Sequence, residues 1–167
     1  RGKMPEPETL LECIKRRIYP KKDLLGKKIC VSAGPTREAI DPVRFISNNS
    51  TGKMGIEIAK MAAYRGGDVS LVTGPIFESV PDFIKRIDVK SAGDMYDEIM
   101  KISGEQDIII KAAAVADYTP ESYSDEKIKK KDSDMSIKLK RTKDILKELG
   151  EKKKTLGKSQ FICGFSM

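Results

Sequence analysis

Short apolar runs alternate with longer amphipathic stretches along most of the chain, which is the pattern of strands separated by helices. Helical spacing of apolar residues occurs in three stretches. The first follows Gly52, the second runs from Ala92 to Ile102, and the third covers about residues 143–154. Strands separated by helices imply right-handed crossovers and an α/β fold with a Rossmann-like, doubly wound, mainly parallel sheet. The expected strands are residues 27–33, 68–73, 84–90, 107–115 and 160–166, with an edge strand at 135–141.

The spacing of apolar residues also assigns one apolar face to each helix. The helix after Gly52 stops at Gly66-Gly67, a good left-handed terminator, and the next helix is expected to bury Met95, Ile99 and Ile102. The apolar face of the first of these helices comprises Met54, Ile58, Met61 and Ala62.

The first 26 residues lack this alternation. They are polar and contain prolines, with a short amphipathic piece around Leu10, Leu11, Ile14 and Ile18. We therefore expect a linker or arm over residues 1–25 and a folded domain over residues 26–167. The chain stops within or just after the last predicted strand, so the domain is expected to be C-terminally incomplete.

The composition fits one cytoplasmic domain. With 39% hydrophobic residues in 167, the chain has room for a single ordinary core. No apolar run approaches the roughly 20 residues that cross a bilayer, and the charged, proline-rich start is unlike a signal peptide. Cys30 and Cys163 lie in apolar strand-like runs, as buried free thiols do, and together with Cys13 they fit a reducing cytoplasm.

Charge and the absence of histidine narrow the chemistry. Without histidine, a Ser-His-Asp triad, a Cys-His pair and a histidine metal site are excluded. The net charge of +7 has three readings: a nucleic-acid partner, a solvated face or a polyanionic small ligand. Aromatic residues are sparse and no nucleic-acid motif accompanies the charge, which favours a solvated face or a small ligand. Two lysine clusters stand out, Lys127, Lys129, Lys130 and Lys131, and Lys152–Lys154.

Polar turns follow the first, second and fourth predicted strands, at the edge where ligands of parallel sheets bind. These turns are Gly34–Thr36, Thr73–Pro75 and Ala114–Asp117. The polar run Arg44–Gly55 enters a helix, whose N-terminal N–H groups and dipole favour an anion. The dinucleotide fingerprint G-x-G-x-x-G and the Walker A motif are both absent, so a different nucleotide chemistry is expected.

Five ordered motifs lie between residues 26 and 167: Ala33–Glu38, Ile40–Asn48, Ser50–Gly55, Ala112–Tyr118 and Lys127–Lys130. Together they resemble phosphopantothenoylcysteine synthetase, the ligase half of a bifunctional coenzyme A enzyme. Residues 1–20 resemble the end of its flavin-dependent decarboxylase half and the linker, so FMN is expected only in the absent decarboxylase domain.

This resemblance implies a two-step ligation. The carboxylate of 4′-phosphopantothenate attacks the α-phosphate of CTP, with Mg²⁺ accompanying the triphosphate, and pyrophosphate leaves. The amine of L-cysteine then attacks the acyl-cytidylate and CMP leaves. The resemblance also implies a homodimer, and residues 120–142 are expected to carry both a flap and dimer contacts.

The resemblance assigns roles residue by residue. Asn48 is expected to hold the carbonyl of the acyl-cytidylate, Lys127 to close over the activated phosphate, and Arg44 to support this loop or the anionic substrate. Further substrate-binding positions are Ser50, Gly52, Lys53 and Ala114. The nucleotide-binding positions are Gly34, Thr36, Lys111, Ala112, Ala113, Asp117, Lys127, Lys143, Asp144, Ile145, Leu146 and Phe165, and no side-chain metal ligand is identified.

Purely structural roles, without ligand contact, remain as alternatives for these residues. Asn48 or Asp117 could be a cap, Arg44 a surface ion pair, Lys127 part of a solvated charged face, and Phe165 a core residue. Residues 120–135 contain hardly any apolar anchor, so the flap is expected to be flexible without ligand.

The sequence also departs from the family pattern. Where the family has Asn-Pro-Asp-Ile, this chain reads Thr142–Ile145, which puts contacts from Lys143 in question. Further family lysines that reach the triphosphate would follow Met167.

A short-chain oxidoreductase is the competing class of enzyme. Tyr123 and Lys127 have its Tyr-x-x-x-Lys spacing, but they lie in a charged stretch and the glycine fingerprint is absent.

Overall fold

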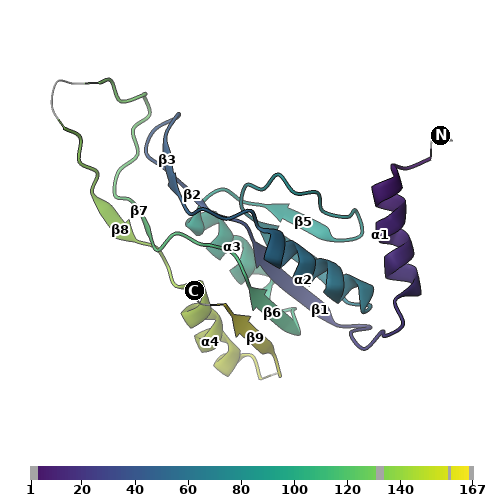
Figure 1. The fold of residues 1–167 in the computed structure, drawn as a ribbon. Helices are drawn as coiled ribbons and strands as arrows, with labels where there is room; N and C mark the ends of the chain where they lie inside the picture. The colour runs from purple at the N-terminus through teal and green to yellow at the C-terminus, as the bar shows by residue number, and fades with distance from the viewer. Residues whose placement is uncertain (1–3, 131–133, 158, 166–167) are drawn as a thin grey trace.

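A computed structural model describes residues 4–130, 134–157 and 159–165. Its centre is a parallel sheet with the order β5-β4-β1-β6-β9 (Figure 1). The predicted α/β, Rossmann-like, mainly parallel sheet is confirmed. The strands are β1 (Lys28–Ala33), β4 (Asp68–Thr73), β5 (Lys85–Asp88), β6 (Ile108–Lys111) and β9 (Phe161–Gly164).

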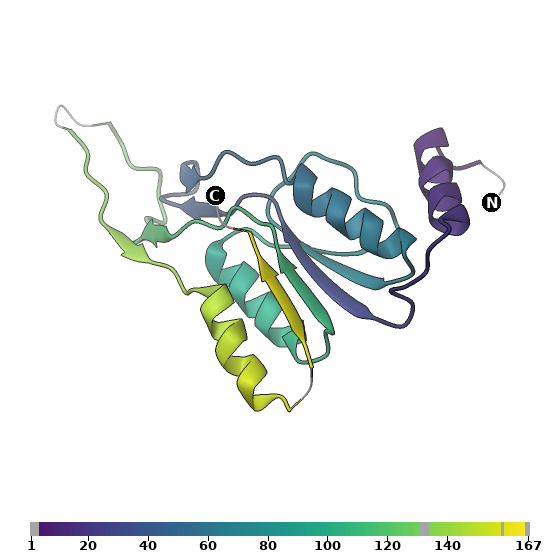
Figure 2. The same ribbon diagram turned by 60° about the horizontal axis from the view of Figure 1, so that its bottom comes forward.

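Helices cover the two faces of this sheet. α2 (Lys53–Tyr64) packs on one face, where Ile56 and Ala59 meet the side chains of β1 and β4. α3 (Ala92–Ser103) and α4 (Ile145–Thr155) pack on the other face around Met95 and Leu149 (Figure 2). Two apolar layers therefore sandwich the sheet, as in doubly wound folds.

The connection between β4 and β5 contains no helix. Its apolar residues Ile76, Val80, Phe83 and Ile84 instead pack against the core on the α2 side. The segment thus fills, with loop side chains, the space that a crossover helix occupies in a complete βαβ unit.

The buried face of α2 differs from the prediction. Met54 is 49% exposed and Met61 is 41% exposed, although Ala62 is buried. The helix lies against the sheet through Gly55, Ala59 and Ala63, because small residues four apart allow a close approach. The predicted stripe instead borders a cavity of about 590 Å³ next to β6 and β9.

In α3 the prediction is closer. Met95 and Ile99 are fully buried as expected, while Ile102 is half-buried. The helix begins with a capping box between Ser91 and Asp94.

Two antiparallel strand pairs extend from the carboxyl edge of the sheet (Figure 1). The first joins β2 (Arg37–Ala39) to β3 (Phe45–Ser47), and the second joins β7 (Tyr118–Pro120) to β8 (Leu139–Arg141). β8 lies inside the predicted edge strand at 135–141 but is shorter. β2, β3 and β7 were not predicted, because three residues are too few to show a periodicity of two.

The N-terminal arm is a helix, α1 (Pro7–Ile18), which has no buried residue. It contacts the domain through Tyr64, whose hydroxyl donates a hydrogen bond to Glu12 and whose ring stacks on Tyr19. The amphipathic piece is thus a helix in the structure, while its role as a linker or arm stays a prediction. Among the residues that the structure describes, no helix is long and apolar enough to span a bilayer.

We expect the thiols to differ in reactivity. Burial raises the pKa of the Cys30 thiol to about 12, whereas Cys13 is exposed. Iodoacetamide near pH 8 should therefore label Cys13 and leave Cys30 unmodified until the protein is denatured, since the thiolate is the nucleophile. Peptide mass spectrometry measures the difference, and labelling of Cys30 as fast as Cys13 would contradict the buried position of β1.

Candidate functional site

The turns after β1, β4 and β6 meet at the carboxyl edge of the sheet. The amide N–H of Ala114 donates to the carbonyl of Gly34 at 2.9 Å, and that of Gly74 donates to the carbonyl of Ala33 at 3.1 Å. Pro35 and Ala114 form a further parallel bridge. The three turns predicted to converge do so.

Glycine allows the β1 turn and the start of α2 to touch. Gly34 has a φ of 73° and Gly52 a φ of 77°, the left-handed region that favours glycine. A Cβ added to either residue would lie 2.7 Å from Cγ2 of Ile76. Gly34 and Gly52 are therefore required by close approach, whatever ligand binds beside them.

The N-terminus of α2 carries uncompensated positive character. Gly52 is its N-cap, no side chain caps it, and its first turn contains Lys53 but no acidic residue. Because the free N–H groups and the dipole of such a terminus favour an anion, this end of α2 suits phosphate. Next to it lies a cavity of about 300 Å³, whose lining residues include Arg37, Phe45, Asn48–Thr51 and Phe77.

Asn48 joins this loop to the turn after β6. Its Nδ2 donates to the carbonyls of Ala114 and Val115, at 3.2 Å each. Since Gly52 caps α2, the alternative that Asn48 caps this helix is wrong. Ser50 is half-buried and its hydroxyl accepts from the N–H of Gly52 at 3.3 Å, so it shapes the loop directly before the helix.

Thr36 takes a different role from the predicted one. Its side chain is fully buried, and its Oγ1 accepts from the N–H of Ala116 at 3.0 Å. Its carbonyl accepts from the hydroxyl of Ser47 at 2.7 Å. Thr36 thus ties the β1 turn to its neighbours, and its buried side chain leaves only the backbone for the nucleotide contact, which stays a prediction.

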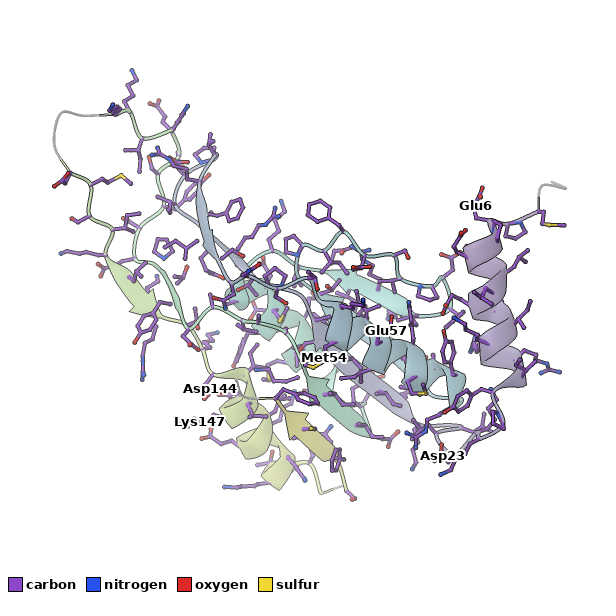
Figure 3. All side chains as sticks on the ribbon, viewed as in Figure 1. Glu6, Asp23, Met54, Glu57, Asp144 and Lys147 are labelled. Carbon is purple, nitrogen blue, oxygen red and sulfur yellow. The ribbon has the colours of Figure 1, made fainter. Side chains whose placement is uncertain are left out.

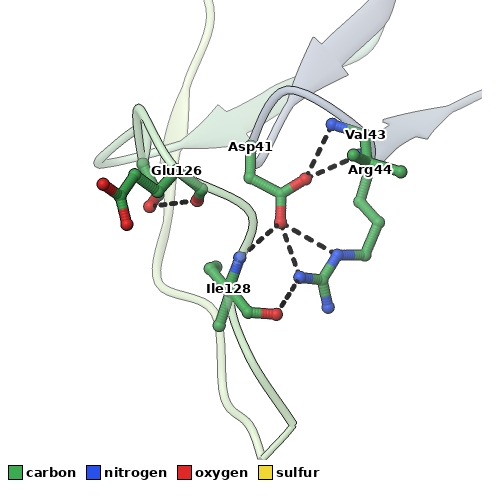
Figure 4. Close-up of polar contacts among 6 residues, drawn as sticks. Asp41, Val43, Arg44, Glu126 and Ile128 are labelled. Atoms are coloured by element: carbon green, nitrogen blue, oxygen red, sulfur yellow. Dashed lines mark hydrogen bonds and ion pairs between the residues drawn. The ribbon is translucent and has the colours of Figure 1, made fainter.

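Arg44 belongs to a polar centre that includes Asp41 (Figure 4). The guanidinium donates to the Asp41 carboxylate from Nε at 2.9 Å and from Nη2 at 2.6 Å, and Nη2 also donates to the carbonyl of Ile128 at 2.6 Å. Of the two predicted roles, the structure shows support of the loop, while contact of Arg44 with the anionic substrate stays a prediction.

The pKa of Asp41 reflects the same centre. Burial of the carboxyl acts to raise its pKa, but hydrogen bonds from the N–H groups of Val43 and Arg44, from the guanidinium and from the N–H of Ile128 hold it well below its usual range. Asp41 was not predicted as a site residue. The Asp-x-Val-Arg spacing was the available signal, because an Asp side chain often accepts from the N–H two residues on.

Lys127 is exposed on the segment between β7 and β8. Neighbouring Ile128 is half-buried and bonded through its backbone, so the base of the predicted flap is held in place. Lys131, which the sequence places in the same cluster, lies outside the described residues. Tyr123 is on the same non-helical segment, so the oxidoreductase dyad lacks the helix that it needs.

A second group of charged residues gathers after β6 and before α4. Lys111, the last residue of β6, is half-buried, with Asp144 and Asp117 near it. Burial lowers the pKa of Lys111, against the opposing pull of the two carboxylates. Asp144 is the N-cap of α4 and accepts from the N–H of Lys147 at 3.0 Å (Figure 3).

The small residues of β6 and its turn bring this group beside the β1 turn. The N–H of Ala112 donates to the carbonyl of Ser32, and that of Ala113 donates to the Ser32 hydroxyl. Ala112, Ala113 and Ala114 are all half-buried at the carboxyl edge, where they were predicted to lie.

Leu146 and Phe165 add an apolar surface next to this group. Phe165 is 54% exposed and its N–H donates to the carbonyl of Lys111, so the alternative of core burial is wrong. Leu146 is also exposed and lies against Gly164, where a Cβ would come within 2.7 Å of its Cδ2. These side chains offer a surface on which a base can stack.

Ile145 and Lys143 both make contacts within the protein. Ile145 is buried in the core between α3 and α4, so its side chain does not face the site. The ammonium of the exposed Lys143 lies 4.2 Å from the ring centroid of Tyr96, a cation–π contact with α3, and its nucleotide contact stays a prediction. The sequence of this turn, Thr142–Ile145, departs from the family pattern Asn-Pro-Asp-Ile, which is consistent with a different position of the Lys143 side chain.

The fold and the site together define a class of protein. It is a Rossmann-like α/β domain with a candidate ligand site at the carboxyl edge of a parallel sheet, flanked by a β extension. Residues 24–167 match the DNA/pantothenate metabolism flavoprotein C-terminal domain, and the chain belongs to that family.

Curated relatives agree with this assignment. The coenzyme A biosynthesis bifunctional protein CoaBC of Bacillus subtilis (strain 168) is 45% identical over 169 residues, which cover 99% of this chain and 41% of that protein. A cysteine/cysteine sulfinic acid decarboxylase from an unknown prokaryotic organism is 44% identical over 172 residues, which cover 100% of this chain and 47% of that protein. The chain thus spans less than half the length of these relatives.

A solved structure is similar as well. The crystal structure of the C-terminal domain of a coenzyme A biosynthesis bifunctional protein CoaBC superposes with a TM-score of 0.72 at 42% identity. The similarity covers 85% of this chain and 65% of that one.

We expect Lys111 to lower stability and raise nucleotide affinity. Its lowered pKa means that folding disfavours the protonated form, so the charged side chain costs stability at neutral pH and the cost disappears as pH rises. Lys111→Met should therefore raise the thermal unfolding midpoint of the free protein and weaken CTP binding by about tenfold. Lys101→Met, at an exposed position on α3, is the matched control. A lower midpoint with unchanged CTP affinity would contradict this role.

Proposed function

We propose that the chain is the phosphopantothenate–cysteine ligase part of a coenzyme A biosynthesis enzyme and that it uses CTP. The observation that carries the proposal is the junction at Asn48, whose amide bonds the carbonyls of Ala114 and Val115 beside the uncapped start of α2. Asn48 thus lies beside a helix terminus suited to phosphate, and one of its two N–H groups would have to leave a backbone carbonyl to bind an acyl oxygen. The names of the CoaBC relatives support the pathway.

The decarboxylase name of another relative at similar identity does not by itself favour decarboxylation here. The chain matches 47% of that protein and 41% of the CoaBC protein, so the shared part is common to relatives with different names. Geometry at the carboxyl edge therefore supports the choice more directly than the names do.

The proposed chemistry needs orientation and charge neutralisation rather than a strong base. In the first step the substrate carboxylate oxygen bonds to the α-phosphorus and pyrophosphate leaves. The α2 terminus, Lys53 and Lys127 would offset phosphate charge during this step. In the second step the cysteine nitrogen bonds to the acyl carbon, loses a proton, and CMP leaves, while Asn48 holds the carbonyl in position.

The charged group after β6 would take the nucleoside. Asp117 and Asp144 can accept from amino or hydroxyl groups, the ammonium of Lys111 can donate to base or phosphate acceptors, and Phe165 with Leu146 would stack the base.

Mg²⁺ would enter with the triphosphate and be held mainly by phosphate oxygens and water. Among residues 4–130, 134–157 and 159–165, no three His, Cys, Asp or Glu side chains gather as a metal site. We place FMN, which the flavoprotein name of the family implies, outside this chain.

The remaining partners are part of the same proposal. The substrates are 4′-phosphopantothenate, L-cysteine and CTP, the location is the cytoplasm, and two copies pair through the extension that contains β7 and β8. Neither nucleic acid nor a membrane is a proposed partner.

Titration calorimetry in the presence of Mg²⁺ tests the nucleotide. We expect saturable binding of CTP, weaker binding of ATP, and none of NADH, because no dinucleotide fingerprint is present. Duplex DNA is a further ligand, for which steep salt dependence would indicate binding through phosphates. Tight binding of NADH or of DNA without binding of CTP would overturn the proposal.

Asn48→Asp should block the second step. A carboxylate would face the carbonyls of Ala114 and Val115, and it cannot donate to them or to the acyl oxygen. In the full-length protein we expect pyrophosphate release from CTP to continue while amide product falls by about a hundredfold or more. Ser79→Asp, which adds a carboxylate at an exposed position between β4 and β5, is the control. Normal amide formation by Asn48→Asp would remove Asn48 from the mechanism.

A further inference from the structure

The carboxylate of Asp41 is the best-satisfied buried charge near the site. Its side chain is 0% exposed. Oδ1 accepts from the N–H groups of Val43 at 2.9 Å and Arg44 at 2.8 Å, and Oδ2 accepts from the guanidinium and from the N–H of Ile128 at 3.1 Å (Figure 4). Local turn geometry accounts for the bonds to Val43 and Arg44, but not for the bond to a residue 87 positions away.

The Asp41–Arg44 pair holds both polar groups of the Ile128 backbone. Asp41 accepts from its N–H, and Arg44 Nη2 donates to its carbonyl at 2.6 Å. Because a peptide unit is planar, fixing the N–H of Ile128 also fixes the carbonyl and Cα of Lys127. Lys127 can then move its side chain, but its backbone is tied to the turn between β2 and β3.

A second contact holds the same segment. The N–H of Ser124 donates to the carbonyl of Ile40 at 3.1 Å, and the Ser124 hydroxyl donates to the carbonyl of Glu126 at 2.7 Å. Residues 124–128 are thus bonded at both ends, although their side chains offer little apolar surface to pack.

The same hairpin carries Asn48. Arg44 directly precedes β3, and Asn48 directly follows it, about 13 Å further along an extended strand. The short strand β3 therefore links Asn48, which bonds the turn after β6, to the Asp41–Arg44 pair, which holds the segment of Lys127.

We propose that Asp41 is a positioning residue for Lys127, acting through the backbone of Ile128. This inference rests on the proposed ligase function and deepens it. The buried carboxylate, paired with Arg44, keeps the ammonium-bearing segment at the carboxyl edge before any substrate arrives. Pre-placing the cation removes ordering cost from the step in which phosphate charge develops.

Asp41→Asn separates this role from a general loss of folding. The Asn side chain keeps an oxygen for the N–H groups of Val43 and Arg44 and keeps the volume of Asp41. Its NH₂ group would replace Oδ2, which now accepts from Arg44 and Ile128, so the bond to the flap segment is lost first.

A double-mutant cycle with Lys127→Gln, in the full-length protein, tests the coupling. We expect Asp41→Asn to slow CTP-dependent pyrophosphate release by about tenfold with little change in the KM for CTP. The double variant should be no slower than Lys127→Gln alone, because the two residues act through one position. Asp125→Asn, which removes a charge from an exposed position on the same segment, is the control. Additive losses, or a normal rate for Asp41→Asn, would overturn the proposal.

Hydrogen exchange gives a readout that does not depend on the reaction. In Asp41→Asn, the amides of residues 124–130 should exchange faster while those of β1 and β6 keep their protection. Arg44→Lys should show a smaller effect of the same kind, since it loses the bond to the Ile128 carbonyl. Unchanged exchange in this segment would overturn the anchor. Absence of CTP turnover in the unsubstituted protein, with the exchange effect present, would instead overturn the ligase function and leave the anchor standing.

Discussion

The close approach of α2 to the carboxyl end of β1 is the constraint on which the rest of the site depends. At Gly55, a Cβ would lie 2.6 Å from Cβ of Ala33, and at Gly52 it would lie 3.0 Å from the backbone nitrogen of Gly34. Only glycine at these positions lets the first turn of the helix rest on the strand. The uncapped N–H groups of α2 are thereby brought to the edge where the β4 and β6 turns also arrive.

Around this contact, buried polar side chains hold the irregular backbone. Thr36 bonds the turn after β6, Glu38 accepts from the N–H of Ala92 at the start of α3, and Asp41 holds the turn between β2 and β3. Each joins two segments that no ladder pairs with each other, and each is nearly or fully inaccessible to solvent. The residues left exposed at the same edge, Asn48 and Lys127, are the ones proposed to meet substrate. The side chains that hold the backbone are therefore buried, and the side chains proposed to meet substrate are exposed.

Much of the fold could be predicted from the sequence because long elements leave periodic patterns. The five parallel strands and the helices from α2 to α4 were placed within a few residues, and the convergence of the three turns followed from the parallel sheet. The face of α2 was wrong because Gly and Ala make the closest contacts with the sheet, while hydrophobicity alone favoured the methionines. The three-residue strands of the extension left no pattern.

The residues of the candidate site also include some whose positions could be predicted from the sequence and others whose roles could not. The loop of Asn48 and the segment after β6 lie together, and this was foreseeable from their places after strands. Ile145 and Thr36 were assigned to ligand because the family motif contains them, but a motif does not distinguish residues that touch ligand from those that hold the backbone. Asp41 was overlooked for the converse reason, since its long-range partner Ile128 is far away in the chain and only the fold brings them together.

Backbone hydrogen bonds hold the base of the flap at Ser124 and Ile128, and this reduces the conformational entropy that the flap would lose in the proposed mechanism. A charged segment with few apolar residues gains little from burial, which argued for flexibility over the whole of residues 120–135. The structure instead fixes Ser124 and Ile128 by backbone bonds, two of them to a charged pair, and such bonds to ions are among the stronger ones. Polar anchoring can therefore order a segment that hydrophobic burial cannot. Lys127 then has only its side-chain rotamers left to restrict when phosphate charge appears beside it, so less of the binding free energy is consumed in closing the site.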